Sequence, residues 1–213
     1  MRTALKGCLA ALMLLLPLTS GAGGSDMDDT IEPLRTWSLP ASAGETLEIK
    51  LMTGAGVRII GWDKDEISVA SDWTDEKCRD AEFEVQRLSQ GALVATRYPA
   101  GTGVVTHNCS FSIEIKLPRK FDVRIRSAGG GVAIQDMRGD VTGTTGGGSI
   151  EVSGLRGSIR LRTGGGSIMV RDSDLEGSLA TGGGAVRFTN VSGGVTGWSG
   201  SQRGVVRGRS RSS

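Results

Sequence analysis

Apolar and polar residues alternate in many short stretches in the second half of the chain, a pattern typical of half-buried β-strands. Runs of three glycines separate these stretches and begin at positions 129, 146, 164 and 182, so the sequence repeats about every 18 residues. Positions one period apart form columns of similar residues. One column is apolar and another carries hydroxyl groups: Ile134, Val152, Val170 and Phe188 form the first, and Thr145, Thr163, Thr181 and Ser199 the second.

The repeat predicts an all-β fold, a single-chain parallel β-helix or β-solenoid with coils of about 18 residues. We expect the glycines to form its sharp corners, because glycine accepts positive φ and lets backbones approach closely. The hydroxyl column is expected to hydrogen-bond to the backbone at these corners. A calcium-binding β-roll is not favoured, because Ser149 and Ser167 stand where that repeat has Asp.

The first half repeats the theme less regularly. Residues 54–59 match residues 129–134 position by position, which indicates an earlier unit of the same kind. Residues 83–86 and 93–96 are expected to form two antiparallel strands inside an excursion of about 72–110. The predicted β-solenoid domain therefore spans 45–200, with a 23–44 extension before it and a basic, disordered tail at 201–213.

The first 22 residues are typical of a signal peptide that is cleaved on export. Arg2 and Lys6 precede an apolar run that ends at Leu18, and small residues follow at 20–22. The run is too short to span a bilayer. Cys8 precedes the apolar run instead of following it, which disfavours a lipoprotein. We expect an exported protein, in the periplasm or at the cell surface, with no transmembrane segment after cleavage.

Composition and charge exclude several classes of protein. The 34 glycines among 213 residues lack the period of collagen and disfavour a helical protein. With a single His, the chain offers no multi-histidine metal site. Loss of Arg2 and Lys6 would leave 23 basic and 23 acidic residues, a balance that argues against nucleic-acid binding. We find no catalytic, cofactor-binding or metal-ligating constellation, and His107 reads as a surface residue.

Cys78 and Cys109 are the two cysteines outside the signal segment. Disulfides persist outside the cytoplasm, so we expect these two residues to be bonded and to staple the base of the excursion. Two unpaired thiols are the alternative.

An offset of 18 places Arg124 and Arg160 in one outward column and Arg126 and Arg162 in the next. Their sequence neighbours are apolar, so the arginines must point outward if the apolar residues form the core. The simpler explanation is that the charged face keeps the protein soluble and discourages its sheet from associating with other sheets. The alternative is a weak site for an anionic polymer, since guanidinium groups make paired contacts to carboxylate or phosphate.

The signal segment, the strand pair at 47–59, Lys116-Leu117-Pro118 and the repeated Thr-Gly-Gly-Gly-Ser-Ile units together resemble the bacterial putative-adhesin family of β-strand-repeat envelope proteins. The resemblance covers about residues 45–200. It implies a right-handed extracytoplasmic β-helix, an adhesive or envelope-associated role and no catalytic residues. We therefore expect a non-enzymatic, adhesin-like binding or structural module, with an envelope polysaccharide or another envelope protein as partner. An envelope-stress accessory protein acting on a membrane partner and a polysaccharide-active β-helix enzyme are the alternatives.

Overall fold

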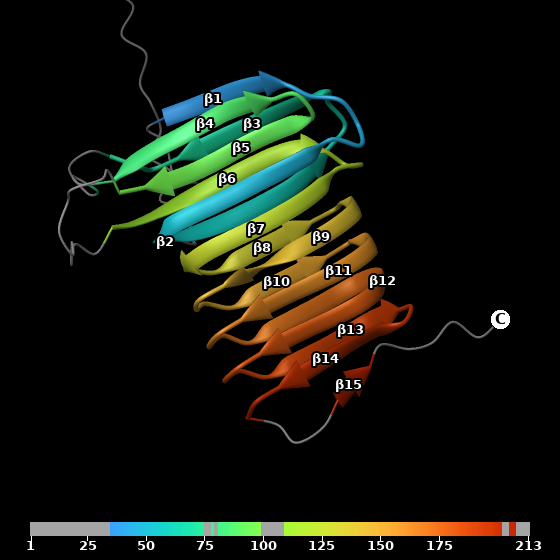
Figure 1. Ribbon diagram of the computed structural model, residues 1–213. Coiled ribbons are helices and arrows are strands. Elements are labelled where there is room, and N and C mark those ends of the chain that lie inside the picture. The colour runs from blue at the N-terminus through green and yellow to red at the C-terminus, as the bar shows by residue number, and fades with distance from the viewer. Residues whose placement is uncertain (1–34, 75–77, 79–80, 99–108, 202–204, 208–213) are drawn as a thin grey trace, which may run out of the picture. The chain divides into compact units, whose positions relative to one another are not determined.

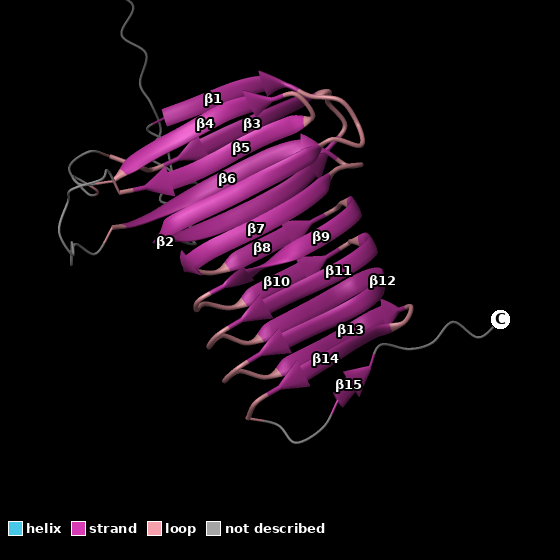
Figure 2. Ribbon diagram, in the orientation of Figure 1, coloured by secondary structure: helices cyan, strands magenta, loops and turns pink. Residues whose placement is uncertain are grey.

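The computed structural model describes residues 35–74, 78, 81–98, 109–201 and 205–207. Within these ranges every regular element is a β-strand and no helix occurs (Figure 2), so no helix there could span a membrane. The strands are β1 (Arg35–Pro40), β2 (Thr46–Trp62), β3 (Glu66–Ser71), β4 (Glu82–Leu88), β5 (Gly91–Arg97), β6 (Ser110–Pro118), β7 (Asp122–Gly129), β8 (Val132–Gln135), β9 (Arg138–Thr145), β10 (Ile150–Ser153), β11 (Arg156–Thr163), β12 (Ile168–Thr181), β13 (Val186–Ser192), β14 (Val195–Ser199) and β15 (Val205–Arg207).

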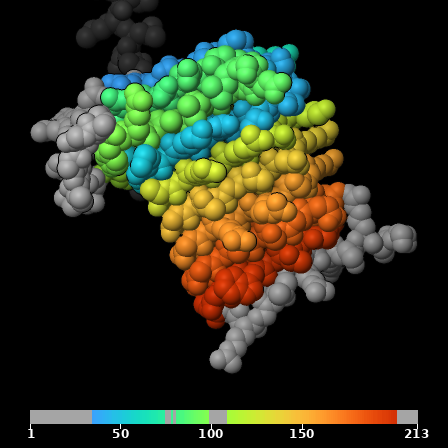
Figure 3. Space-filling view, in the orientation of Figure 1, coloured from blue at the N-terminus to red at the C-terminus, as the bar shows by residue number. Residues whose placement is uncertain are grey.

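Strands β9 to β14 pair in parallel with partners 18 residues away, as the repeat predicts. Val141 pairs with Ile159 across β9 and β11, and Ile150 pairs with Ile168 across β10 and β12. In the space-filling view the successive strands form adjacent bands from yellow to red (Figure 3). The period of the sequence therefore sets the register of the pairing.

The expected fold class, a β-helix or β-solenoid, is wrong. Hydrogen-bonded neighbours run from β2 through β7, β9, β11, β12, β10 and β8 and return to β2, which closes a seven-stranded parallel β-barrel with the other strands outside it (Figure 1). The closure depends on the two longest strands. β2 pairs with β7 through its first half and with β8 through its second. β12 pairs with β10 through its first half and with β11 through its second. The repeat period predicts which residues pair, but it carries no signal that the sheet closes.

The apolar columns of the repeat line the interior of this barrel. Val152 pairs with Ile134 on one side and Val170 on the other, and all three are at most 1 % exposed. Burial alternates residue by residue along the strands, so the intervening positions face outward. The assignment of inward and outward positions from the alternation is confirmed.

Two kinds of residue turn the chain at its corners. Gly148 has φ of 77°, and a Cβ atom there would lie within 2.3 Å of the Gly130 carbonyl oxygen, so no larger residue fits. At another corner a column at the 18-residue offset adopts the left-handed conformation: Asp136, Gly154, Asp172 and Asn190, with φ of 55°, 65°, 48° and 52°. Asp and Asn tolerate this conformation better than other side chains do, which explains their place in the column.

The remaining strands extend the sheet around the barrel. β4 and β5 form the expected antiparallel hairpin, and β5 pairs in parallel with the first half of β2. β1 and β6 both pair antiparallel with β3, and β6 also pairs in parallel with the second half of β2. In the tail that we expected to be disordered, Val205–Arg207 forms β15, antiparallel to β14. The proposed signal segment and His107 lie outside the described residues.

Candidate functional site

Four arginines from β7 and β11 gather on one outer face of the barrel. Arg124 pairs with Thr142, which in turn pairs with Arg160, and Thr144 lies in the same way between Arg126 and Arg162. All four arginines are exposed, while the residues between them on each strand, Ile125 and Leu161, are buried. The structure therefore brings together the residues that the 18-residue offset predicts. We call Arg124, Arg126, Arg160 and Arg162 the arginine face.

A shallow depression of about 400 Å³ lies between the two rows of arginines. Its floor is β9, which contributes Thr142, Gly143 and Thr144 between the longer side chains of β7 and β11. Gly143 lies between Ile125 and Leu161, and a Cβ atom on it would come within 2.2 Å of the Ile125 carbonyl oxygen. The depression exists because one strand with short side chains separates two strands with long ones.

The charge of this face is largely uncompensated. Glu48 on β2 lies 3.9 Å from Arg124 and also pairs with Lys50 at 2.6 Å. The hydrogen bond from Lys50, together with the positive charges of Lys50, Arg124 and Arg126, holds the pKa of Glu48 below its usual value. Arg160 and Arg162 have no ion-pair partner in the part of the chain that the structure describes. Their guanidinium groups are available to an anion from outside.

Trp198 lies on the same side of the sheet and was missed by our sequence reasoning. It pairs with Ala180, which pairs with Arg162, so it continues the outward column of Arg126, Thr144 and Arg162. Its side chain is 53 % exposed. The signal was present in the sequence, because Trp198 stands 36 residues, or two repeat periods, after Arg162.

The hydroxyl column holds the corners of the barrel and does not face a ligand. Thr163 Oγ1 donates to the Gly148 carbonyl oxygen at 2.8 Å, and Thr181 Oγ1 donates to that of Gly166 at 2.7 Å. Both threonines are at most 4 % exposed. The predicted role of this column in bonding corner backbone is confirmed.

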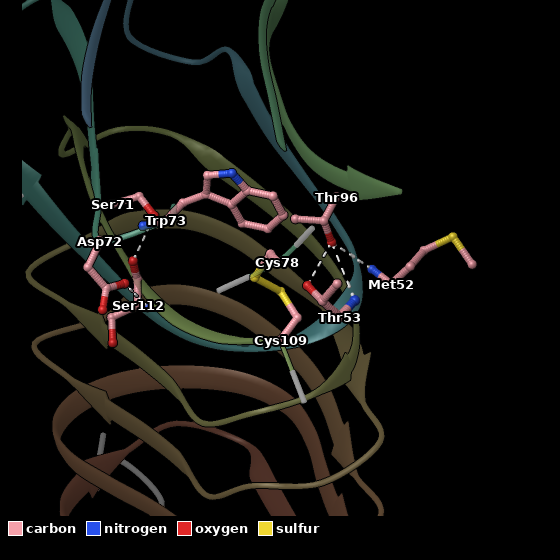
Figure 4. The surroundings of a disulfide bond; sticks show 9 residues. All are labelled: Met52, Thr53, Ser71, Asp72, Trp73, Cys78, Thr96, Cys109 and Ser112. Carbon is pink, nitrogen blue, oxygen red and sulfur yellow. Dashed lines mark hydrogen bonds between the residues drawn. A yellow bond between two sulfur atoms is a disulfide. The ribbon is translucent and has the colours of Figure 1, made fainter. Parts of the chain in front are cut away.

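Cys78 and Cys109 form a disulfide with a Cα–Cα distance of 4.9 Å. Trp73, Thr53 and Thr96 surround it (Figure 4), and the two threonine hydroxyls lie 3.0 Å apart. The bond spans 31 positions and links the two ends of the excursion. It is buried, since its cysteines are 2 % and 7 % exposed, so its role here is structural.

Possible metal ligands do not cluster in the described ranges: no three His, Cys, Asp or Glu residues there lie close enough to hold an ion. The depression in the arginine face is lined by the four arginines, by the hydroxyls of Thr142 and Thr144 and by Gly143. Glu48 is the carboxylate at its edge. These groups suit the binding of an anion.

No family model and no curated protein matches the chain. Among solved structures, it is similar to a putative cell adhesion protein from Clostridium sporogenes, with 11 % identity, a TM-score of 0.49 and coverage of 73 % of this chain and 98 % of that one. A putative lipid binding protein from Parabacteroides distasonis has 14 % identity and a TM-score of 0.39, with coverage of 78 % and 71 %. A putative adhesin from Bacteroides fragilis has 11 % identity and a TM-score of 0.30, with coverage of 78 % and 95 %.

Two of these three neighbours are thus named as a cell adhesion protein or an adhesin. Their TM-scores lie below 0.5, so we draw no argument about a ligand from them. Membership of the putative-adhesin family stays a prediction.

Proposed function

We propose that this chain is a non-enzymatic, adhesin-like binding module of the bacterial cell envelope, which is exported and holds an anionic envelope polymer on the arginine face. One observation carries the proposal: the register of β7, β9 and β11 places four exposed arginines around one depression, and Arg160 and Arg162 have no carboxylate partner among the described residues. Guanidinium groups bind carboxylate or phosphate through two parallel hydrogen bonds, so they suit such a polymer.

The geometry favours a repeating ligand over a single small anion. Arg126 and Arg162 stand two strand spacings apart, which is about 10 Å between their backbones. The depression is shallow and open, so each contact is weak and is screened by salt over about 8 Å at physiological ionic strength. Several weak contacts along one polymer molecule together give a higher affinity than any single contact, as in other multivalent binding.

The test compares the wild type with Arg160→Ser/Arg162→Ser for retention on immobilised anionic polysaccharide at low salt. The matched control is Arg171→Ser/Arg187→Ser, which removes the same charge from exposed positions on β12 and β13 outside the arginine face. We expect the first variant to elute at clearly lower salt than the control. Equal elution of the two variants would mean that only net charge matters and would refute the site.

A further inference from the structure

A second depression of about 520 Å³ adjoins the arginine face. It lies over the second half of β12, where Ser178 and Ala180 present short side chains between Arg162 of β11 and Trp198 of β14. Arg162 lines both depressions. The surface is therefore a series of rows across the strands, in which long side chains alternate with short ones.

The exposed indole of Trp198 is unusual for this molecule. Trp198 and Met52 are the large apolar side chains that stand out in solvent within the described residues, whereas Trp73 is 1 % exposed. An exposed aromatic ring that borders a depression is typical of a binding surface, because it offers a large rigid apolar area at low cost in conformational entropy.

The neighbouring backbone holds Trp198 in this place. Gly197 points inward, and a Cβ atom there would meet Val186 Cγ1 at 2.5 Å and the ring of Phe188 at 3.2 Å. β14 therefore lies close against the core, and the alternation along the strand directs Trp198 outward. The position of the indole follows from the packing of β14 against β13.

We propose that the polymer is an acidic polysaccharide that crosses the strands from β7 to β14, with a sugar ring seated against Trp198 and its carboxylates on Arg162 and the arginines beyond. This proposal rests on the proposed function and names the chemical class of the ligand. The column from Arg126 through Arg162 to Trp198 covers four strand spacings, about 19 Å, which is long enough for several sugar units.

The combination of one aromatic ring with a row of guanidinium groups favours a sugar acid over other polyanions. The C–H groups on one face of a sugar ring form an apolar surface that packs flat on an indole, while the carboxylates at the ring edge remain free for arginine. Polyphosphate carries the charge but no ring. A polyanion of that kind would use the arginines and leave Trp198 uncovered.

The experiment uses Trp198→Ala in the intact chain, with Met52→Ala as the control for loss of an exposed apolar side chain. The probes are oligogalacturonate, which is a polymer of a sugar acid, inorganic polyphosphate, and vesicles that contain an anionic phospholipid. We expect Trp198→Ala to weaken binding of oligogalacturonate by at least about fivefold and to leave binding of polyphosphate unchanged. Trp198→Phe retains a ring and should restore much of the affinity, and Met52→Ala should bind like the wild type.

A second readout follows the indole itself. Oligogalacturonate should protect the exposed tryptophan of the wild type from quenching by acrylamide, and polyphosphate should not. Trp198→Ala should show no such protection, because its other tryptophans are more buried.

The outcomes separate this inference from the proposed function. If Arg160→Ser/Arg162→Ser weakens binding of both soluble probes while Trp198→Ala weakens neither, the arginine site stands and the role of the indole is refuted. If Trp198→Ala reduces binding to the vesicles alone, the ligand is a membrane surface and the inference is wrong. If Arg160→Ser/Arg162→Ser binds every probe as the wild type does, the proposed function itself is refuted, and this inference with it.

Discussion

Thr163 and Gly148 lie 15 residues apart and are joined by a hydrogen bond of 2.8 Å from the threonine hydroxyl to the glycine carbonyl oxygen. Ser199 and Thr181 make the equivalent bond to Gly184 and Gly166. The bond runs from the end of one strand to the corner of the preceding unit. One side chain per repeat thus ties neighbouring units together where the backbone turns away from the strand ladder.

Replacement of Thr163 with Val removes this hydroxyl while keeping the shape and the strand preference of the side chain. We expect Thr163→Val to lower the free energy of unfolding by about 1–2 kcal/mol, because a buried corner loses its hydrogen bond. Thr144→Val is the control, since Thr144 is exposed on β9. Urea unfolding of both variants measures the difference, and equal midpoints would contradict the role of the hydroxyl column.

The register of the core makes a sharper prediction. Val152 is 1 % exposed between Ile134 and Val170, so Val152→Asp buries a charge and should cost several kcal/mol of stability. Glu151→Lys, one residue away on the exposed side, should be nearly neutral. Thermal unfolding compares the two, and a similar melting temperature for both would show that the inward and outward positions are misassigned.

The disulfide between Cys78 and Cys109 should stabilise the first half of the chain. A bond that closes about 31 residues is worth roughly 3–4 kcal/mol on the chain-entropy estimate. We expect Cys78→Ala/Cys109→Ala to melt at lower temperature than the oxidised wild type. Dithiothreitol should lower the melting temperature of the wild type toward that of the variant and leave the variant unchanged. If dithiothreitol leaves the melting temperature of the wild type unchanged, the result would argue against a stabilising role for the disulfide.

Glu48 should limit how strongly the arginine face binds polyanions. Its carboxylate lies 3.9 Å from Arg124, so Glu48→Gln raises the charge of the face and should increase the salt needed for elution from a sulfated polysaccharide at pH 7. The pKa of Glu48 is lowered from its usual 4.5, chiefly by the hydrogen bond from Lys50, so most of the carboxylate is still ionised at pH 4.5. The difference between variant and wild type should therefore persist at pH 4.5 and vanish only as the pH falls through the lowered pKa.

A sulfated resin suits this comparison because its charge does not change over the same range of pH. The control is Glu151→Gln, which removes an exposed carboxylate from β10, outside the arginine face. An equal gain in retention for both variants would show that net charge alone governs binding.

Much of the local structure could be predicted from the sequence. The 18-residue period determined which residues pair, because parallel strands in equivalent units place equivalent positions side by side. The alternation determined which side chains face inward, and so it placed Arg160 and Arg162 together with Arg124 and Arg126 on one outer face. The same columns assigned Thr163 and its equivalents to the corners. Each of these features has a signal in neighbouring or equally spaced residues.

The tertiary structure alone decided how the sheet closes into a barrel and which distant strands pair with each other. β2 and β12 each continue past a corner and so pair with two different strands of the barrel, and this closes the barrel that the repeat did not predict. The pairing of β5 with the first half of β2 is likewise a contact between distant segments with no repeat to predict it. The physical reason is that apolar alternation records only whether a side chain meets the core. Closure depends on backbone hydrogen bonds between distant segments. Every residue can make such bonds, proline as an acceptor alone, so they leave little trace in the sequence.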